Sequence, residues 1–287
     1  MPAKLINGRG GLPAVYVKNN AATAEIMLLG AHLVSYKPAA SSELIWLSKA
    51  TRFENGVAIR GGIPVCWPWF SKHPEHPDFP MHGFARTANW SFTEAHDDGD
   101  AKTIVTMTLK NSPATKAFFP YAFTVKAIFT IADTLTVELV TTNDDDKPFT
   151  ISQALHTYFQ IGAIEEIAID GVGGKDYLDK VGGGCVERTL AEGPLTVHSE
   201  VDYVFKNAPG PFAIHDAKLG RTITVTTEGS NSAVVWNPWI EKSKKMSDYL
   251  PNSYLDMVCV ETCNAADDAR TVAPHATHSL KAVYTIR

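Results

Sequence analysis

The chain has 287 residues, of which 45% are hydrophobic and 20% are charged, and its formal net charge is −5. This composition is that of a folded globular protein and excludes a largely disordered chain. A weakly negative chain without a basic run is not typical of a nucleic-acid or membrane-surface protein, so an anionic ligand would have to be met by local cations.

Strand patterns dominate the chain. Branched and aromatic residues are frequent, and several segments alternate with period two. The predicted strands are 23–36, 102–109, 123–131, 135–143, 149–162, 221–228, 232–237, 256–262 and 279–286. Turn-forming clusters such as 143–148 and 208–211 separate them. Because no helical segments alternate with these strands, we expect an all-β fold, a large antiparallel sandwich or barrel, as one domain over 1–287.

The ends of the chain and its cysteines bear on its location. The first residues, MPAKLINGRGG, lack the apolar core of a signal peptide, and no apolar stretch reaches the ~20 residues of a membrane span. The four cysteines, Cys66, Cys185, Cys259 and Cys263, form no CxxC pair. We therefore expect reduced thiols in a cytoplasmic protein.

Three patterns suggest a metal site or a phosphate loop, but none of them supports one. His73, His76 and His82 lie close together in sequence, but the first two stand among prolines in an expected exposed loop. On one strand face the sulfurs of Cys259 and Cys263 would be ~13 Å apart, too far to share a zinc ion. The glycine-rich stretches 171–176 and 181–185 match no phosphate loop and are expected to be turns.

The segment DMVCVETCNA (256–265) places the carboxylate of Glu261 among apolar side chains. In a strand, Glu261 shares one face with Met257, Cys259 and Cys263. A buried carboxylate without a partner is costly, so Glu261 is expected to pair with a cation, to have a raised pKa, or to take part in chemistry. A paired or rim-exposed glutamate remains the structural alternative.

As a strand, the segment FTISQALHTYFQIG (149–162) has one apolar face and one polar face. His156, Tyr158 and Gln160 belong to the polar face, which could line a groove the size of a sugar. A histidine and a glutamate on separate strands are sufficient for proton transfer near neutral pH. A structural role for His156 stays open at this point.

Two arginines stand in unusually apolar stretches. Arg60 precedes the glycines of IRGGIPVCWPWF (59–70), and Arg86 ends MHGFAR (81–86). The guanidinium group suits bidentate recognition of phosphate, particularly in a dry site. On this interpretation the glycines after Arg60 let the backbone approach the ligand closely. Structural ion pairs with acidic neighbours are the alternative for both arginines.

Five segments considered together resemble a known family. They occur in the order IRGGIPVCWPWF, MHGFAR, ALHTYF (154–159), VVWNPW (234–239) and VCVET (258–262). They are similar to the aldose 1-epimerase, or galactose mutarotase-like, superfamily, and within it to the glucose-6-phosphate 1-epimerase (hexose-6-phosphate mutarotase) branch. The similarity extends from 30–38 to the last strand.

The resemblance implies a fold and a set of catalytic residues. The fold would be a large antiparallel β-sandwich with a concave sugar-binding face. His156 matches the general acid of the family and Glu261 its general base, while His82 matches a second histidine of the active site. The implied reaction interconverts the α and β anomers of D-glucose 6-phosphate, and other aldohexose 6-phosphates stay open.

The resemblance also implies the binding residues and the partners. Arg60 and Arg86 match the arginines that bind phosphate, and Asp202 of SEVDYVF matches, more loosely, the carboxylate that binds sugar hydroxyls. No metal or organic cofactor is implied. We expect a monomer that acts on a small-molecule hexose 6-phosphate and binds neither nucleic acid nor membrane.

Three other functions are compatible with parts of the pattern. A non-catalytic sugar-phosphate binding protein on the same scaffold would keep the arginines but could lose His156 or Glu261. A metal-dependent sugar-phosphate isomerase of the cupin type would use His73, His76 and His82. A mutarotase of free sugars would not need two arginines in the pocket.

Overall fold

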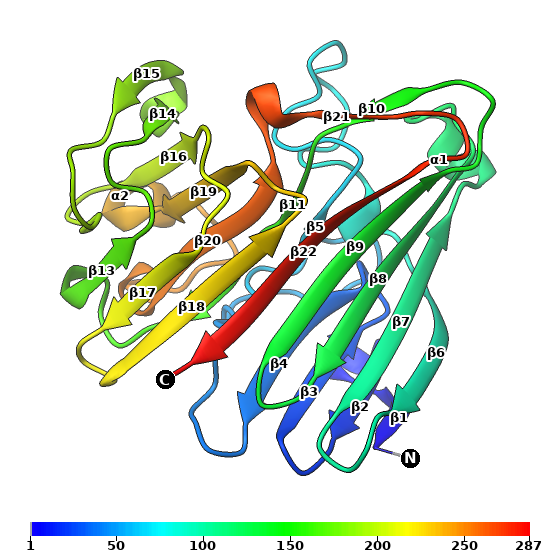
Figure 1. Ribbon diagram of the computed structural model, residues 1–287, viewed down its shortest axis with the longest axis horizontal. Coiled ribbons are helices and arrows are strands. Elements are labelled where there is room, and N and C mark those ends of the chain that lie inside the picture. Colours follow the sequence, from blue (N-terminus) through cyan, green and yellow to red (C-terminus); the bar gives the residue numbers. More distant parts are fainter. Residues whose placement is uncertain (1) are drawn as a thin grey trace.

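Two eight-stranded antiparallel sheets pack face to face in the computed structural model, which describes residues 2–287 (Figure 1). We call them the back sheet and the site sheet. The strands of the back sheet are, in order, β13 (Ile167–Asp170), β17 (Phe212–Asp216), β18 (Arg221–Glu228), β22 (Thr277–Ile286), β9 (Leu135–Asn143), β8 (Phe123–Ile131), β7 (Thr103–Lys110) and β6 (Ser91–Asp97). Those of the site sheet are β15 (Val186–Thr189), β14 (Asp176–Asp179), β16 (Val201–Phe205), β19 (Ser232–Asn237), β20 (Met257–Asn264), β11 (Gln153–Leu155) and β5 (Val65–Cys66), with β12 (Tyr158–Gln160) also paired to β20.

Smaller elements complete the sandwich. One further sheet has the order β1 (Ala3–Asn7), β2 (Pro13–Lys18), β3 (Ala22–Met27) and β4 (His32–Pro38), and another pairs β10 (Phe149–Ile151) with β21 (Arg270–Val272). The α-helices are α1 (Pro113–Lys116) and α2 (Trp239–Ser243), and the 3₁₀ turns are η1 (Arg9–Gly11), η2 (Ala85–Thr87), η3 (Ile164–Glu166), η4 (Val181–Gly183), η5 (Ser253–Asp256) and η6 (Ala266–Asp268). Among residues 2–287, no helix has both the length and the apolar character that a membrane crossing requires.

The main hydrophobic core lies between the two large sheets. Inward-facing residues of β9, such as Val137 and Leu139, belong to the same buried cluster as Val258 and Val260 of β20. A second buried cluster, with Tyr158, Trp236 and Cys259 among its members, lies on the other face of the site sheet. Every residue of β19 and β20 is therefore buried. A polar side chain on these strands is removed from water whichever way it points.

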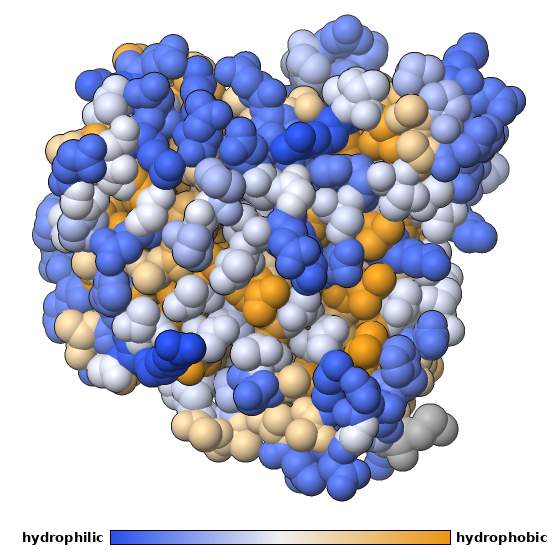
Figure 2. Space-filling view, in the orientation of Figure 1, coloured by the Kyte–Doolittle hydropathy of each residue, from blue (hydrophilic) through white to orange (hydrophobic). Residues whose placement is uncertain are grey.

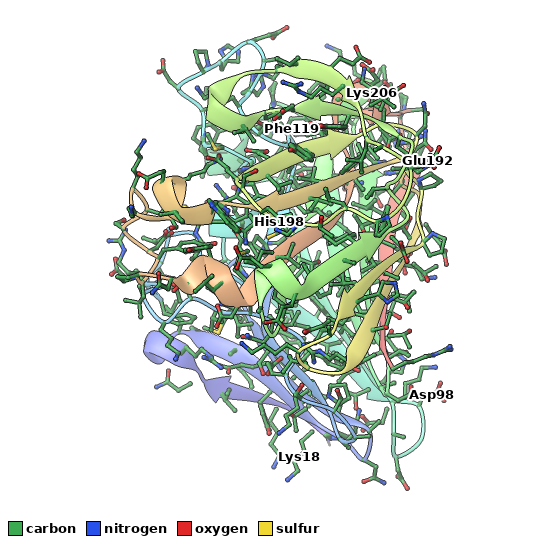
Figure 3. All side chains as sticks on the ribbon, turned by 90° about the vertical axis from the view of Figure 1, so that its left-hand side faces the viewer. Lys18, Asp98, Phe119, Glu192, His198 and Lys206 are labelled. Carbon is green, nitrogen blue, oxygen red and sulfur yellow. The ribbon has the colours of Figure 1, made fainter. Side chains whose placement is uncertain are left out.

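The outside of the molecule differs from this interior. Figure 2 shows one face as mostly hydrophilic or neutral, with apolar patches scattered among the polar side chains. In Figure 3, turned by 90°, the β1–β4 sheet lies at the lower end of the molecule, beyond which Lys18 projects, and Lys206 lies at the upper end. The termini and the β1–β4 sheet are thus separate from the strands β14–β16 that edge the site sheet (Figure 1).

The predicted β-sandwich is confirmed, and several predicted strands have their observed bounds, notably 123–131, 135–143, 221–228 and 232–237. Two predicted strands were wrong in extent. Segment 23–36 divides into β3 and β4 around a turn, and 149–162 divides into β10, β11 and β12. The second division leaves residues 156–157 outside the regular strands, where the backbone N–H of His156 donates to the carbonyl of Pro64 at 3.0 Å.

The glycines that follow Arg60 pack closely against Trp46 and His32. A Cβ atom on Gly61 would lie 2.6 Å from the carbonyl oxygen of Trp46, and one on Gly62 would lie 2.4 Å from Nε2 of His32. The His32 ring contacts the carbonyl of Gly61 at 2.7 Å. The sequence analysis expected these glycines to let the backbone approach a ligand, and the structure shows that both are also needed for packing inside the protein. They make room for His32 and Trp46, and this packing fixes the position of Arg60.

This packing predicts a difference between two glycine-to-alanine substitutions. Gly62 and Gly56 have similar φ angles of +71° and +77°, but Gly56 has no atom within 4 Å of an added Cβ. We expect Gly56→Ala to lower the free energy of unfolding by about 1 kcal/mol, the usual cost of a left-handed alanine. Gly62→Ala adds overpacking and should cost about 3 kcal/mol. Urea unfolding of both variants measures the difference. Equal losses of unfolding free energy would contradict the close packing at Gly62.

Candidate active site

Strand β20 positions Glu261 as its sequence pattern predicted. Met257, Cys259 and Cys263 belong to the cluster on the open side of the site sheet, whereas Val258 and Val260 belong to the main core. Glu261 shares the face of Cys259 because residues two apart on a strand point the same way. Its side chain is only 1% exposed. The buried carboxylate inferred from the sequence is confirmed, and no lysine or arginine forms an ion pair with it within residues 2–287.

Strand register brings His156 to Glu261. On one side of the break, Leu155 lies opposite Thr262, and on the other, Tyr158 lies opposite Cys259. The antiparallel register is therefore unchanged across the break, and position 156 lies opposite position 261. Nδ1 of His156 is 3.3 Å from Oε1 of Glu261. Two segments that are distant in sequence thus meet as facing members of neighbouring strands.

Aromatic packing fixes the plane of the His156 ring. The rings of His156 and Tyr158 stack with centroids 4.9 Å apart and an angle of 7° between their planes. Trp236 meets the His156 ring edge-on at 6.1 Å. Only 10% of the His156 side chain is exposed. The imidazole therefore has little freedom to rotate away from Glu261.

Burial controls the protonation of this pair. It raises the pKa of Glu261 well above the usual 4.5, and the negative charge of Asp202 raises it further, against the opposing charges of Arg86 and Lys180. Burial, followed by the positive charges of Arg86 and Arg60, lowers the pKa of His156 to about 3. Both shifts favour uncharged groups. The two shifts therefore favour the state in which the carboxyl group of Glu261 holds the proton and the ring of His156 is neutral.

His82 lies beside this pair. Its ring centroid is 5.8 Å from that of His156. The backbone N–H of Ser71 donates to Nδ1 of His82 at 3.1 Å, so Nδ1 carries no proton and Nε2 must carry one in the neutral ring. Burial, followed by the positive charge of Arg86, holds the pKa of His82 well below 6.5. His82 is therefore a neutral hydrogen-bond donor at the site.

The two arginines differ in how they are held. Arg60 donates through Nε to Asp248 at 3.0 Å and through Nη1 to the hydroxyl of Tyr158 at 2.9 Å. The structural ion pair that the sequence left open is thus present for Arg60. Arg86, on η2, donates through Nη2 to the carbonyl of Met81 at 2.7 Å. Within residues 2–287 it has no carboxylate partner, and its buried Nε makes no hydrogen bond.

Asp202 and Lys180 complete the charges around the pair. Asp202, on β16, lies opposite Trp236, which lies opposite Cys259, so all three share one face of the site sheet. Its carboxylate accepts a hydrogen bond from Lys242 at 3.1 Å. Lys180, whose Nζ is 3.3 Å from Oγ of Ser71, acts through its charge on both Glu261 and His82. Nothing in the sequence pattern pointed to Lys180, which lies between β14 and η4.

The structure does not assemble the metal site considered from the sequence. The rings of His73 and His76 are 5.0 Å apart in a largely exposed loop, whereas His82 faces His156. Within residues 2–287, the group of three metal-ligating side chains that does come together is His156, Cys259 and Glu261, whose ligand atoms all lie within 4.8 Å of one another. Strand register creates this group, so sequence spacing could not reveal it.

Comparisons of the sequence and of the structure with known proteins agree on one family. Residues 13–285 match the model of the family described as "Aldose 1-epimerase". A protein of Escherichia coli (strain K12), provisionally named a glucose-6-phosphate 1-epimerase, is 36% identical over 272 residues, which cover 95% of this chain and 90% of that protein. A protein of Cenchrus ciliaris with the same provisional name is 35% identical over 274 residues, covering 90% and 80%. The crystal structure of a provisionally assigned mutarotase from Salmonella typhimurium superimposes with a TM-score of 0.89 at 34% identity, covering 96% of this chain and 90% of that one.

The protonation of the pair can be measured directly. Because its pKa is lowered to about 3, we expect the His156 ring of the free protein to stay uncharged from about pH 8 down to about pH 5, where an ordinary histidine would have titrated near 6.5. Long-range ¹⁵N–¹H NMR of the imidazole nitrogens reports the charge, and the spectrum of His156→Asn assigns the signal. A titration midpoint near 6.5 would contradict the pair as described.

Proposed function

The chain belongs to the aldose 1-epimerase family and is an isomerase that interconverts the α and β anomers of an aldose; we propose that its substrate is D-glucose 6-phosphate, with His156 as general acid and Glu261 as general base. The observation that carries the assignment of roles is the buried contact of 3.3 Å between these side chains. A protein that only binds sugar phosphates would have no use for a desolvated proton-sharing pair, whose burial is costly.

Ring opening needs a proton removed from one oxygen and a proton added to another. Glu261, as the carboxylate, takes the proton of the C1 hydroxyl, and His156, as the imidazolium, gives a proton to the ring oxygen O5 while the C1–O5 bond breaks. The product is the open-chain aldehyde, and the pair again holds one proton, now on Glu261. Rotation about C1–C2 presents the other carbonyl face to O5, and the same transfers in reverse close the ring. Acid and base each typically contribute 10²–10⁴-fold.

The pair suits this exchange because its total charge never changes. Before ring opening it is carboxylate plus imidazolium, and afterwards it is carboxyl plus imidazole. A dry site disfavours net charge but tolerates either neutral distribution of a single proton. The buried Oε2 of Glu261, which makes no hydrogen bond with any of residues 2–287, is the oxygen we assign to the C1 hydroxyl.

Cations around the pair support a phosphorylated substrate. The positive charges of Arg60, Arg86 and Lys180 all act on His82, and both arginines act on His156. We propose that Arg60 and Arg86 bind the 6-phosphate, with Arg60 keeping Asp248 on Nε and offering Nη2. A bound phosphate dianion would offset the arginine charges that lower the pKa of His156. Substrate binding would thereby favour the imidazolium that the reaction needs.

Two further residues are assigned to the sugar. His82, a neutral donor through Nε2, would hydrogen-bond the ring or the oxygen of the developing aldehyde. The carboxylate of Asp202, with 24% of its side chain exposed on the same sheet face, would accept hydrogen bonds from sugar hydroxyls. The three buried unpaired cysteines and the exposed Cys185 are consistent with a reducing compartment, and we propose a cytoplasmic monomer without nucleic-acid or membrane partners.

Removing either proton-transfer group should abolish most of the activity. We expect His156→Asn and Glu261→Gln each to lower kcat for anomer exchange of glucose 6-phosphate by more than about 10²-fold, because each removes one transfer step. Circular dichroism should show the fold retained. The matched control is His76→Asn in the exposed loop, which should leave kcat unchanged. Activity within tenfold of wild type in either site variant would refute the roles.

The phosphate assignment makes a separate prediction for Arg60. Arg60→Lys keeps the charge but loses the planar fork, so we expect KM for glucose 6-phosphate to rise about tenfold or more. Arg9→Lys is the control, because Arg9 donates to Glu25 at the same 3.0 Å that separates Arg60 from Asp248. Steady-state kinetics on both variants decide the matter. An unchanged KM in Arg60→Lys would restrict Arg60 to its structural ion pair.

A further inference from the structure

The proton-transfer pair has a third neighbour that the reaction does not use. Cys259 lies on the same face of β20 as Glu261, and its Sγ atom, a ring nitrogen of His156 and a carboxylate oxygen of Glu261 lie within 4.8 Å of one another. All three residues are buried, with exposed fractions of 8% for His156, 0% for Cys259 and 1% for Glu261. Nitrogen, sulfur and oxygen donors therefore converge on one point inside the site.

Two of these donors lack a hydrogen bond in the described part of the chain. Nδ1 of His156 and Oε2 of Glu261 are buried and make no hydrogen bond within residues 2–287. Buried polar atoms of this kind are normally satisfied. His156 and Glu261 thus each have an atom in the cluster that is free to coordinate a metal ion.

The spacing suits a tetrahedral zinc ion. Zn²⁺ binds imidazole nitrogen and carboxylate oxygen at about 2.0–2.2 Å and thiolate sulfur at about 2.3 Å, which places neighbouring ligand atoms roughly 3.3–3.8 Å apart. The His156–Glu261 contact of 3.3 Å already has this spacing. The Cys259 sulfur needs to move by about 1 Å, which a rotation about its χ1 bond can supply.

We propose that His156, Cys259 and Glu261 form an inhibitory zinc site. Zn²⁺ binds through Nδ1, Sγ and a carboxylate oxygen, the thiol proton and the proton of the Glu261 carboxyl group pass to solvent, and the fourth position stays open to water. No electron transfer is involved. Because Arg86 and Lys180 place positive charge near the same carboxylate, binding is weaker than at a closed four-ligand structural site. The binding rests on geometry alone, whereas the inhibition also rests on the proposed roles of His156 and Glu261.

Inhibition follows from the identity of the ligands. A zinc ion on Nδ1 of His156 removes the ring from its contact with Glu261, and the same ion occupies the carboxylate that would act as base. Neither group can then exchange a proton with the substrate. The cysteine thus makes the site sensitive to thiophilic cations without taking part in the reaction.

Cobalt spectroscopy tests the binding without any assay of activity. Co²⁺ is titrated into the chelator-treated full chain, and thiolate coordination gives a charge-transfer band in the near ultraviolet. We expect one equivalent of Co²⁺, displaced by Zn²⁺, in wild type. Cys259→Ser should lose the band and weaken Zn²⁺ binding by at least about 100-fold, since loss of an outer-shell partner alone costs 10–100-fold.

Matched controls separate this site from the other thiols. Cys263→Ser changes an equally buried cysteine on the same strand face, and Cys185→Ser removes the exposed one, so both should keep the band and the affinity. His156→Asn should weaken binding as Cys259→Ser does, which guards against misfolding of a single variant. Retention of the band in Cys259→Ser, its loss in Cys185→Ser, or no stoichiometric binding by wild type would overturn the proposal.

Inhibition is measured on each variant relative to its own rate without metal. Micromolar Zn²⁺ should inhibit anomer exchange by wild type and by Cys263→Ser, and Cys259→Ser should need at least about 100-fold more. Equal sensitivity of Cys259→Ser and wild type would overturn the inhibitory role. If no variant has activity, the proposed function fails, while the cobalt spectra still decide whether the metal site exists.

Discussion

The burial of one carboxylate next to one imidazole is the constraint on which the rest of the site depends. Glu261 is 1% exposed, and its Oε1 atom lies 3.3 Å from Nδ1 of His156. Low polarity makes either group costly as a lone charge, so the two are coupled through a single proton. The apolar wall of tryptophans and tyrosines therefore contributes to chemistry as well as to packing, because it keeps the pair dry.

The two faces of the site sheet have different roles in keeping this pair away from water. One face packs against the back sheet and provides most of the stability, while the other carries the reactive side chains over a smaller apolar cluster. A local break after β11 releases His156 from regular pairing without changing register. Tyr158 then links the two halves of the site, since its ring stacks on His156 and its hydroxyl accepts a hydrogen bond from Arg60. The charge of Arg60 therefore acts on the protonation of His156 across a short distance.

Much of the fold follows from local pattern, and less of the site does. The segments 123–131 and 135–143 alternate strictly between turn signals, so their strands were predictable to the residue. The face shared by Cys259 and Glu261 follows from strand periodicity alone. The pairing of Arg60 with Asp248, 188 positions away, and the register that places His156 opposite Glu261 depend on how distant segments meet. Local pattern carried no sign of Lys180, and it also missed the strands β1, β2, β5, β6, β13 to β17 and β21.

The most direct test of the account is two-dimensional exchange NMR on equilibrated glucose 6-phosphate with a catalytic amount of the protein, with free glucose in a parallel sample. The account predicts exchange between the α and β anomers of glucose 6-phosphate well above the rate in buffer, and far less acceleration for glucose, which cannot engage the arginines. Acceleration of glucose alone would contradict the phosphate assignment. No acceleration of either sugar would contradict proton transfer by His156 and Glu261 on these substrates.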